Sequence, residues 1–300
     1  MKSGGSDFVC QVLGRLSNLC DLARPLIIRL RGGGGVIDGY DKTGLVQGVR
    51  PVLLEHFPGE ICLVRYGSLA HTLWRAQELT LIHRHRNLLD RPFADFGCGD
   101  GSFGAALFTG IDFGVDNDPE ALSVCGRHKA YLQRVSSSGD KIPLPTGSLG
   151  SVLSNSVIEH TLQPEVWLKE ISRLLRPGGV FMMTVPLLGF ARHLAHFFGW
   201  SESRRINREY HHHNLVEAEK WLEWLKTFNL DPVLVRQFQP PSFTFWYRML
   251  RLVGERGAGA FPGVQEGLWN RARPKMLRMI GESIEGVEDG ANLFVVSRRR

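Results

Sequence analysis

The chain has 300 residues, of which 43% are hydrophobic and 22% are charged. This composition can build a sizeable core, so it excludes a globally disordered protein and favours one large domain or one domain with additions. The net charge of +6 and the pI of about 9.2 are compatible with an acidic substrate, an anionic lipid or RNA. A solvated basic surface is the commoner explanation of such an excess.

Cysteine usage and hydropathy bear on where the protein works. The five cysteines are scattered and form no CxxC pair, which argues against a disulfide framework or a zinc knuckle. No apolar run reaches the roughly 18 residues of a membrane-spanning helix, and the N-terminus lacks a signal-peptide pattern. We expect a cytoplasmic protein with reduced thiols, and peripheral contact with a membrane stays open.

The first part of the chain is expected to form an N-terminal extension, residues 1–66. Within it, residues 8–31 are apolar with interspersed arginines and indicate a basic amphipathic helix, which packs on the core or touches a membrane. Short strands are expected around 36–37 and 61–65. A helix is predicted over 69–88, because apolar residues recur there at helical spacing: Leu69, Leu73, Ala76, Leu79 and Ile82.

From residue 90 onward, strand and helix patterns alternate. Strands are predicted near 92–97, 111–116, 131–136, 151–155 and 179–185, and helices near 102–109, 118–128 and 163–175. This alternation indicates an α/β fold, a parallel sheet with helices on both faces. A Pro-Gly-Gly turn at 177–179 is expected to end the third helix before the last of these strands. The pattern resumes with a helix near 215–228, a strand near 232–238, a mostly helical insertion at 240–289 and a final strand near 291–296.

A glycine-rich turn follows the first core strand. Residues 93–101 read FADFGCGDG, and the second strand, 111–116, ends at Asp116. Glycines let backbone N–H groups approach a ligand closely, and an acid about 20 residues after the first glycine can accept hydrogen bonds from ribose hydroxyls. These features predict a nucleoside-cofactor site at the carboxyl edge of the sheet. Dinucleotide enzymes use a related turn, so an NAD-dependent dehydrogenase is one alternative.

Further motifs follow in order: GVDND at 114–118, IPLP at 142–145, SNSVIEH at 154–160 and LKEISRLLRPGG at 168–179. With the glycine loop, they resemble the class I S-adenosylmethionine-dependent methyltransferases, in the type 11 group that includes ubiquinone and menaquinone C-methyltransferases. The resemblance covers 90–186 well, and 210–238 and 290–298 more loosely. It implies a Rossmann-like, seven-stranded, mostly parallel sheet within a methyltransferase domain at 67–300, whose core is 90–186, and an activity of class EC 2.1.1.-.

The resemblance implies S-adenosyl-L-methionine as the cofactor and assigns residues to it. Asp95 would hold the methionine amino end, and Asp116 the ribose hydroxyls. The other implied cofactor-binding residues are Gly97, Gly99 and Gly101 beneath the methionine and ribose, Asn117 beside the adenine, Asp140 near the adenine amino group, and Asn155 after the fourth strand. Spacing alone would place the adenine-binding acid on Ser138, while the acid itself stands at Asp140.

The chemistry of methyl transfer needs few protein groups. The sulfonium donor is already activated, so the protein mainly aligns the nucleophile and excludes water. His160, next to Glu159, is the candidate catalytic base or orienting group, although Glu-His at this position often only shapes the pocket in this family. Residues 210–214 read YHHHN. No metal is expected there, because no recognised ligand spacing surrounds them; one of these histidines is a candidate for lining the acceptor pocket.

The acceptor-side additions are expected at 187–213 and 240–289, which are rich in aromatic residues. They favour a small-molecule, lipid or glycan acceptor, although the same aromatics would serve as the core of a lid. An RNA or protein methyltransferase is an alternative, but no Asn-Pro-Pro-Tyr motif follows the fourth strand and nucleic acid is not expected as a partner. The other alternative is a catalytically silent, methyltransferase-like partner protein. The intact glycine loop and Asp116 argue against it.

Overall fold

The computed structural model describes residues 50–51, 64–65, 69–255, 274 and 277–300. The chain divides into two compact units, Met1–Asp38 and Gly39–Arg300, and every described residue belongs to the second. The helix expected at 8–31 and the strand expected at 36–37 lie outside the described residues. The described part of 39–66 is a short antiparallel pair, β1 (Arg50–Pro51) and β2 (Val64–Arg65). No helix in the described part combines the length and hydropathy that crossing a membrane requires.

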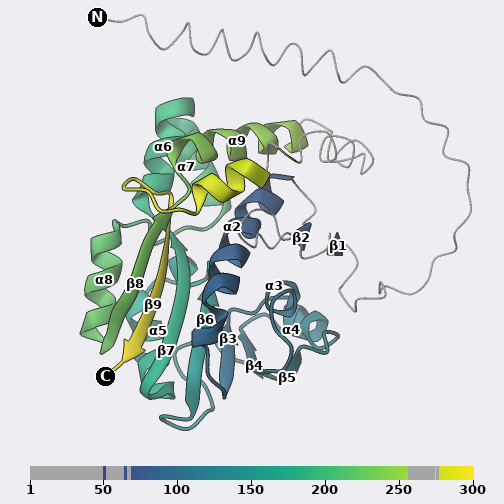
Figure 1. Ribbon diagram of the computed structural model, residues 1–300, viewed down its shortest axis with the longest axis vertical. Coiled ribbons are helices and arrows are strands. Elements are labelled where there is room, and N and C mark those ends of the chain that lie inside the picture. The colour runs from purple at the N-terminus through teal and green to yellow at the C-terminus, as the bar shows by residue number, and fades with distance from the viewer. Residues whose placement is uncertain (1–49, 52–63, 66–68, 256–273, 275–276) are drawn as a thin grey trace, which may run out of the picture. The chain divides into compact units, whose positions relative to one another are not determined.

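A seven-stranded sheet forms the centre of the second unit, in the order β5-β4-β3-β6-β7-β9-β8 (Figure 1). In this spatial order, the first five strands are parallel to one another. Strand β9 is antiparallel to both of its neighbours, β7 and β8. This confirms the predicted mostly parallel sheet. The bounds are β3 Phe93–Phe96, β4 Ile111–Asp116, β5 Tyr131–Ser136, β6 Leu149–Asn155, β7 Leu175–Pro186, β8 Leu230–Phe238 and β9 Asn292–Arg299.

The strand order reverses between β3 and β6. The chain runs from β3 outward through β4 and β5, and then returns to place β6 on the other side of β3. The connections leaving the carboxyl ends of β3 and β6 therefore diverge. In open α/β sheets, this divergence leaves a crevice in which ligands bind.

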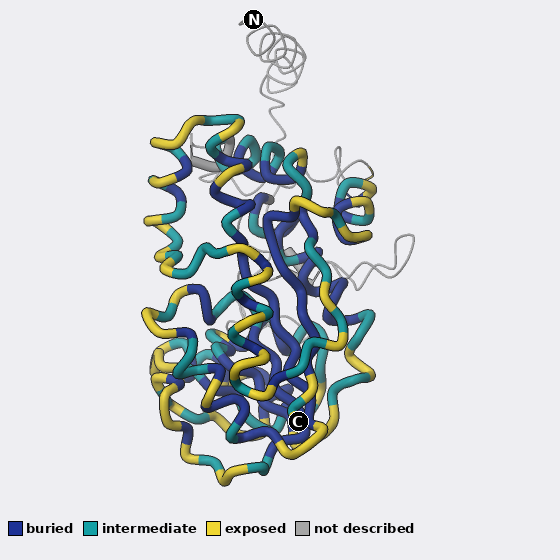
Figure 2. Tube along the Cα trace, turned by 90° about the vertical axis from the view of Figure 1, so that its left-hand side faces the viewer, coloured by how far each residue is buried: buried dark blue, intermediate teal, exposed yellow. Residues whose placement is uncertain are grey.

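Helices cover both faces of the sheet, as predicted. On one face, α5 (Pro164–Leu174) and α8 (Ala218–Thr227) share an apolar cluster with Phe181 and Val295; on the other, α2 (Leu69–His85) and α4 (Pro119–Cys125) share a cluster with Met182 and Phe294. Residues adjacent in β7 and β9 thus point to opposite faces. Figure 2 shows the central strands as buried chain surrounded by more exposed helices.

Three further helices gather beyond the carboxyl ends of the parallel strands (Figure 1): α6 (Leu188–Phe198), α7 (Trp200–Glu209) and α9 (Pro241–Glu255). We call them the cap. They share one apolar cluster with α2, which includes Trp74, Phe190, Ile206, Phe243 and Tyr247. Enclosed by the cap and the sheet, α2 is buried on nearly all sides from Ala70 to His83. The cap helices lie within the two segments expected as acceptor-side additions, of which residues 256–273 and 275–276 lie outside the described residues.

Two details differ from the sequence-based expectation. The Pro-Gly-Gly turn does not precede its strand: α5 ends at Leu174 and β7 begins at once by pairing Leu175 with Leu149. The next pair is Ser151 with Val180, so residues 176–179 form a bulge inside the strand. The helix predicted at 102–109 is shorter in the structure: α3 (Ser102–Ala105) ends after one turn.

Two tryptophans allow a matched test of this packing. Trp221 of α8 is fully buried on the sheet, whereas Trp200 at the start of α7 is 56% exposed. We expect Trp221→Ala to lower the free energy of unfolding by about 3–5 kcal/mol, because the truncation leaves a cavity. The control Trp200→Ala should change it by less than about 0.5 kcal/mol. Urea denaturation measures both, and equal effects would contradict the assigned core.

Candidate active site

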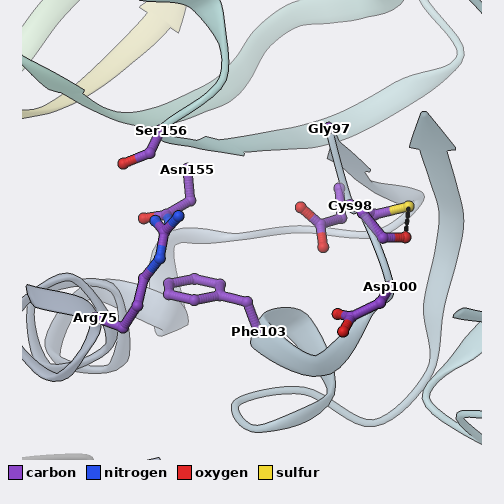
Figure 3. A pocket seen from close by; sticks show the side chains of 9 residues that line it. Arg75, Gly97, Cys98, Asp100, Phe103, Asn155 and Ser156 are labelled. Carbon is purple, nitrogen blue, oxygen red and sulfur yellow. Dashed lines mark hydrogen bonds between the residues drawn. The ribbon is translucent and has the colours of Figure 1, made fainter. Parts of the chain in front are cut away.

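A pocket opens where the strand order reverses (Figure 3). Its walls come from the loop after β3, from α3, from the end of β6 and from α2. Of the residues predicted from the sequence, the structure brings Asp95, Gly97, Gly99 and Asn155 together here. The rest of the lining consists of Arg75, Cys98, Asp100, Phe103 and Ser156. The pocket is therefore shared between the glycine loop, the fourth core strand and a helix that precedes the core.

The three glycines of the loop have different roles. Gly97 has φ +72°, and a Cβ there would lie 2.3 Å from the Val157 side chain, so only glycine lets the loop close onto the end of β6. Gly99 has φ +52°, and apart from its own chain neighbours no residue has an atom within 4 Å of the position of its missing Cβ. This open space borders the pocket and is a cradle that a side chain would fill. Gly101 is outside the lining; a Cβ there would contact the buried side chains of Cys125 and Tyr131.

Asp116 fixes the shape of the glycine loop. Its carboxylate accepts the backbone N–H of Gly99 at 2.7 Å and that of Asp118 at 3.0 Å. One oxygen serves each bond, so each retains a lone pair for a further donor such as a ribose hydroxyl. The following residue, Asn117, is exposed. The carboxylate that was predicted to bind ribose thus also holds the backbone that would lie beneath the cofactor.

The pocket holds charged groups of both signs. Asp95 is 3% exposed and accepts the hydroxyl of Tyr131 at 2.5 Å. Burial raises the pKa of Asp95 to about 6, although the hydrogen bond from Tyr131 opposes this rise. The guanidinium of Arg75 lies over the ring of Phe103, 5.8 Å from its centroid, on the side of Asn155 (Figure 3). One carboxyl and one guanidinium match the zwitterionic end of an amino acid.

The carboxylate of Glu78 on α2 organises this wall, although no sequence motif includes this residue. Glu78 is fully buried. It accepts hydrogen bonds from four side chains of α2 and the β6 end: Trp74 Nε1 at 3.0 Å, Arg75 Nη1 at 2.7 Å, Asn155 Nδ2 at 3.2 Å and Ser156 Oγ at 2.6 Å. Helical periodicity marks only apolar positions, so no sequence signal singled out this acid.

Beyond Ser156 lies a short 3-10 helix, η3 (Ile158–His160), with a second polar group. Glu159 is 1% exposed, and burial raises its pKa to about 8. His160 lies outside the pocket lining; its Nε2 is 3.6 Å from Glu159 Oε1. Of the histidines at 211–213, His212 stacks on His160 with ring centroids 5.4 Å apart. Burial lowers the pKa of His160, and that of His212 to about 3, so both rings are neutral at neutral pH.

Asp140 lies in the loop after β5, outside the pocket lining. It is exposed and accepts the hydroxyl of Ser138 at 2.5 Å, which lowers its pKa. Ser138, the position indicated by spacing, and Asp140, the nearby acid, are therefore hydrogen-bonded to each other.

Comparisons with known proteins agree with this geometry. The family profile described as a methyltransferase domain matches residues 94–183. An uncharacterized methyltransferase of Mycolicibacterium vanbaalenii is 31% identical over 183 residues, which are 58% of this chain and 72% of that protein. One of Mycolicibacterium gilvum is 34% identical over 165 residues, 49% of this chain and 62% of that protein. The chain thus spans less than two thirds of several mycobacterial relatives, and 60% of one from Mycobacterium sp. (strain JLS).

Solved structures share the fold. A geranyl diphosphate C-methyltransferase from Streptomyces coelicolor A3(2) aligns with a TM-score of 0.51 and 15% identity, over 74% of this chain and 77% of that one. A possible histamine N-methyltransferase from Thermotoga maritima aligns with a TM-score of 0.50 and 16% identity, over 77% and 92%. With the glycine loop, Asp116 and the sheet order, these findings show that the chain belongs to the class I S-adenosylmethionine-dependent methyltransferases.

The role of Glu78 can be tested by removing its charge without changing its size. Glu78→Gln places an amide nitrogen among groups that are themselves donors. We expect the free energy of unfolding to fall by about 1–3 kcal/mol, since buried donors lose their acceptor. Glu285→Gln is the control, because Glu285 is exposed in its ion pair with Arg84 and its loss should cost less than about 1 kcal/mol. Urea denaturation measures the free energy of unfolding of both variants, and equal losses would disprove this role of Glu78.

Proposed function

We propose that this chain binds S-adenosyl-L-methionine in the pocket and transfers its methyl group to a small-molecule, lipid or glycan acceptor. The observation that carries this proposal is the open space over Gly99, beside an Asp116 carboxylate that keeps lone pairs for ribose hydroxyls. Family membership supports the cofactor.

The residues present fit the polar groups of this cofactor. Asp116 would bind the ribose hydroxyls, and Asp95 the ammonium of the methionine part, with Asn155 beside it. Arg75 would bind the methionine carboxylate, because its guanidinium lies on the pocket wall beside Asn155. Gly97, Gly99 and Gly101 would supply the backbone path, with Gly101 shaping the turn.

The adenine end is proposed to lie towards Asn117 and the loop that contains Asp140. Both residues are exposed and lie outside the pocket lining described above. They follow β4 and β5, the strands on the same side of β3 as Asp116. A nucleoside whose ribose is held by Asp116 would extend in that direction.

The acceptor is proposed to lie on the side of the cap. The bound cofactor supplies a methyl group on a sulfonium sulfur, so the protein must align the nucleophile. We assign His160 to the acceptor side, since its neutral imidazole can accept a hydrogen bond or a proton. Aromatic rings wall this region: Phe190 and Tyr210 lie 6.0 Å and 5.5 Å from the ring of His212. Such walls suit an acceptor with an apolar part.

We also propose that the protein works in a reducing, cytoplasmic environment. Cys98 beside the pocket and Cys125 of α4 are free thiols whose sulfur atoms lie 4.0 Å apart. Thiols this close persist where the environment keeps them reduced. The proposed contact with a membrane rested on residues 8–31, which lie outside the described part of the chain.

Titration calorimetry tests the cofactor directly. We expect S-adenosylmethionine and its demethylated product to bind and NAD not to bind. Asp116→Ala should weaken binding by at least about tenfold, since charge-assisted hydrogen bonds are each worth about 1.5–3 kcal/mol. The control Glu120→Ala removes an exposed acid of α4 and should leave the affinity unchanged. A folded wild-type protein that binds neither methyl-cycle ligand would refute the proposed activity and favour a silent partner protein.

The raised pKa of Asp95 predicts how cofactor affinity depends on pH. Burial makes the carboxyl titrate near pH 6, and only its ionised form pairs well with the cofactor ammonium. Lowering the pH from 7 to 5 should therefore weaken binding by about tenfold, as the ionised fraction falls. In Asp95→Asn, this pH dependence should vanish and the affinity at pH 7 should be lower. A wild-type affinity that is the same at pH 5 and 7 would show that Asp95 does not face the ammonium.

A further inference from the structure

Glu159, His160 and His212 form a cluster of donor atoms that the cofactor contacts leave unused. Each residue offers one ligand-type atom, and these atoms lie within 4.8 Å of one another. Two of the residues come from η3, and the third comes from the segment after α7. The backbone joins the two segments, because the carbonyl of Glu159 accepts the N–H of His213 at 2.9 Å and that of Asn214 at 3.1 Å.

Hydrogen bonds orient both imidazoles in the same way. Nδ1 of His160 faces the backbone carbonyl of His211 at 3.3 Å, and Nδ1 of His212 faces Oδ1 of Asn207 at 2.8 Å. The amide nitrogen of Asn207 donates to the carbonyl of Ser203 at 2.8 Å, which fixes the direction of its oxygen. An oxygen acceptor requires a proton on Nδ1, so Nε2 of each neutral ring carries the lone pair. Metal-binding histidines are held by such outer hydrogen bonds.

The third member is a buried carboxyl group with an unused oxygen. Glu159 is 1% exposed, and its Oε2 has no hydrogen-bond partner in the structure. Its other oxygen, Oε1, is 3.6 Å from Nε2 of His160. A buried polar atom without a partner is costly, and a bound cation would remove that cost.

We propose that Glu159, His160 and His212 bind one divalent transition-metal ion of the zinc class. Two imidazoles and one carboxylate form a ligand set of catalytic zinc and of non-haem iron sites, whereas magnesium and calcium select oxygen ligands. A zinc–nitrogen distance of about 2.1 Å places neighbouring ligand atoms about 3.4 Å apart in a tetrahedral site. The 3.6 Å between Nε2 of His160 and Oε1 of Glu159 is close to this spacing, and His212 offers a ligand atom within 4.8 Å of the other two.

Chain spacing gave no sign of this site, and the proposal departs from the expectation that no metal binds. Three protein ligands leave a coordination position open, and the half-exposed ring of His160 gives access from solvent. Ser156, three residues before Glu159, lines the cofactor pocket. If the proposed function holds, on which this role rests, the ion would fix an acceptor oxygen or nitrogen beside the methyl donor, and His160 would act as a ligand instead of a base.

Metal binding can be measured without an acceptor. Full-length, untagged protein is stripped with a chelator and then titrated with Zn²⁺ by calorimetry and with Co²⁺ alone by visible absorption. We expect one ion per chain. His212→Gln and Glu159→Gln should weaken binding by more than about 100-fold, and Asn207→Ala by about 10–100-fold as an outer-shell partner. The matched control is His213→Gln, an exposed neighbour, which should bind like the wild type. Azide should change the Co²⁺ spectrum, because it fills the open position.

Thermal unfolding of each variant establishes that it is folded, and the titration of His212→Gln suffices if Glu159→Gln does not fold. Absence of stoichiometric binding by the wild type, or equal weakening by His213→Gln, would overturn the metal site. A Co²⁺ spectrum insensitive to azide would overturn the open position. S-adenosylmethionine binding is measured on the same samples: cofactor without metal refutes this inference alone, whereas metal without cofactor keeps the site and refutes the proposed function.

Discussion

The buried carboxylate of Glu78 is the interaction on which the site depends. A charge without solvent needs compensation, and Glu78 receives it from Trp74 and Arg75 of its own helix and from Asn155 and Ser156 at the β6 end. These bonds fix α2 against the carboxyl edge of the sheet. Because the cap packs on the other side of α2, the same bonds fix the position of the cap relative to the sheet. They also orient Arg75 towards the pocket.

The part of the site proposed to hold the cofactor is built mostly from local geometry. Positive φ angles at Gly97 and Gly99 turn the chain, and Asp116 holds the turn from the next strand. The reversal of strand order then leaves room for a ligand between β3 and β6. The glycine loop and Asp116 lie within about 20 residues of each other, so this part of the site follows from local chain geometry.

The proposed acceptor side of the site depends on parts that are distant in the sequence. Its polar groups come from η3 and from the segment after α7, and its aromatic walls come from the cap. Burial keeps the histidines neutral and raises the pKa of Glu159. The buried carboxyl of Glu159 is a cost to stability at this edge of the sheet, and a bound ligand can offset it.

The sequence by itself determined the α/β class, the family and the glycine loop, because these follow from periodicity and from motifs within a few residues. The strands predicted at 111–116 and 131–136 have those bounds in β4 and β5. Tertiary structure alone decided that α2 is enclosed, that Glu78 joins it to the sheet, and that His212 meets His160. No local pattern encodes such contacts, since they arise only when packing brings segments that are remote in the chain to the same place.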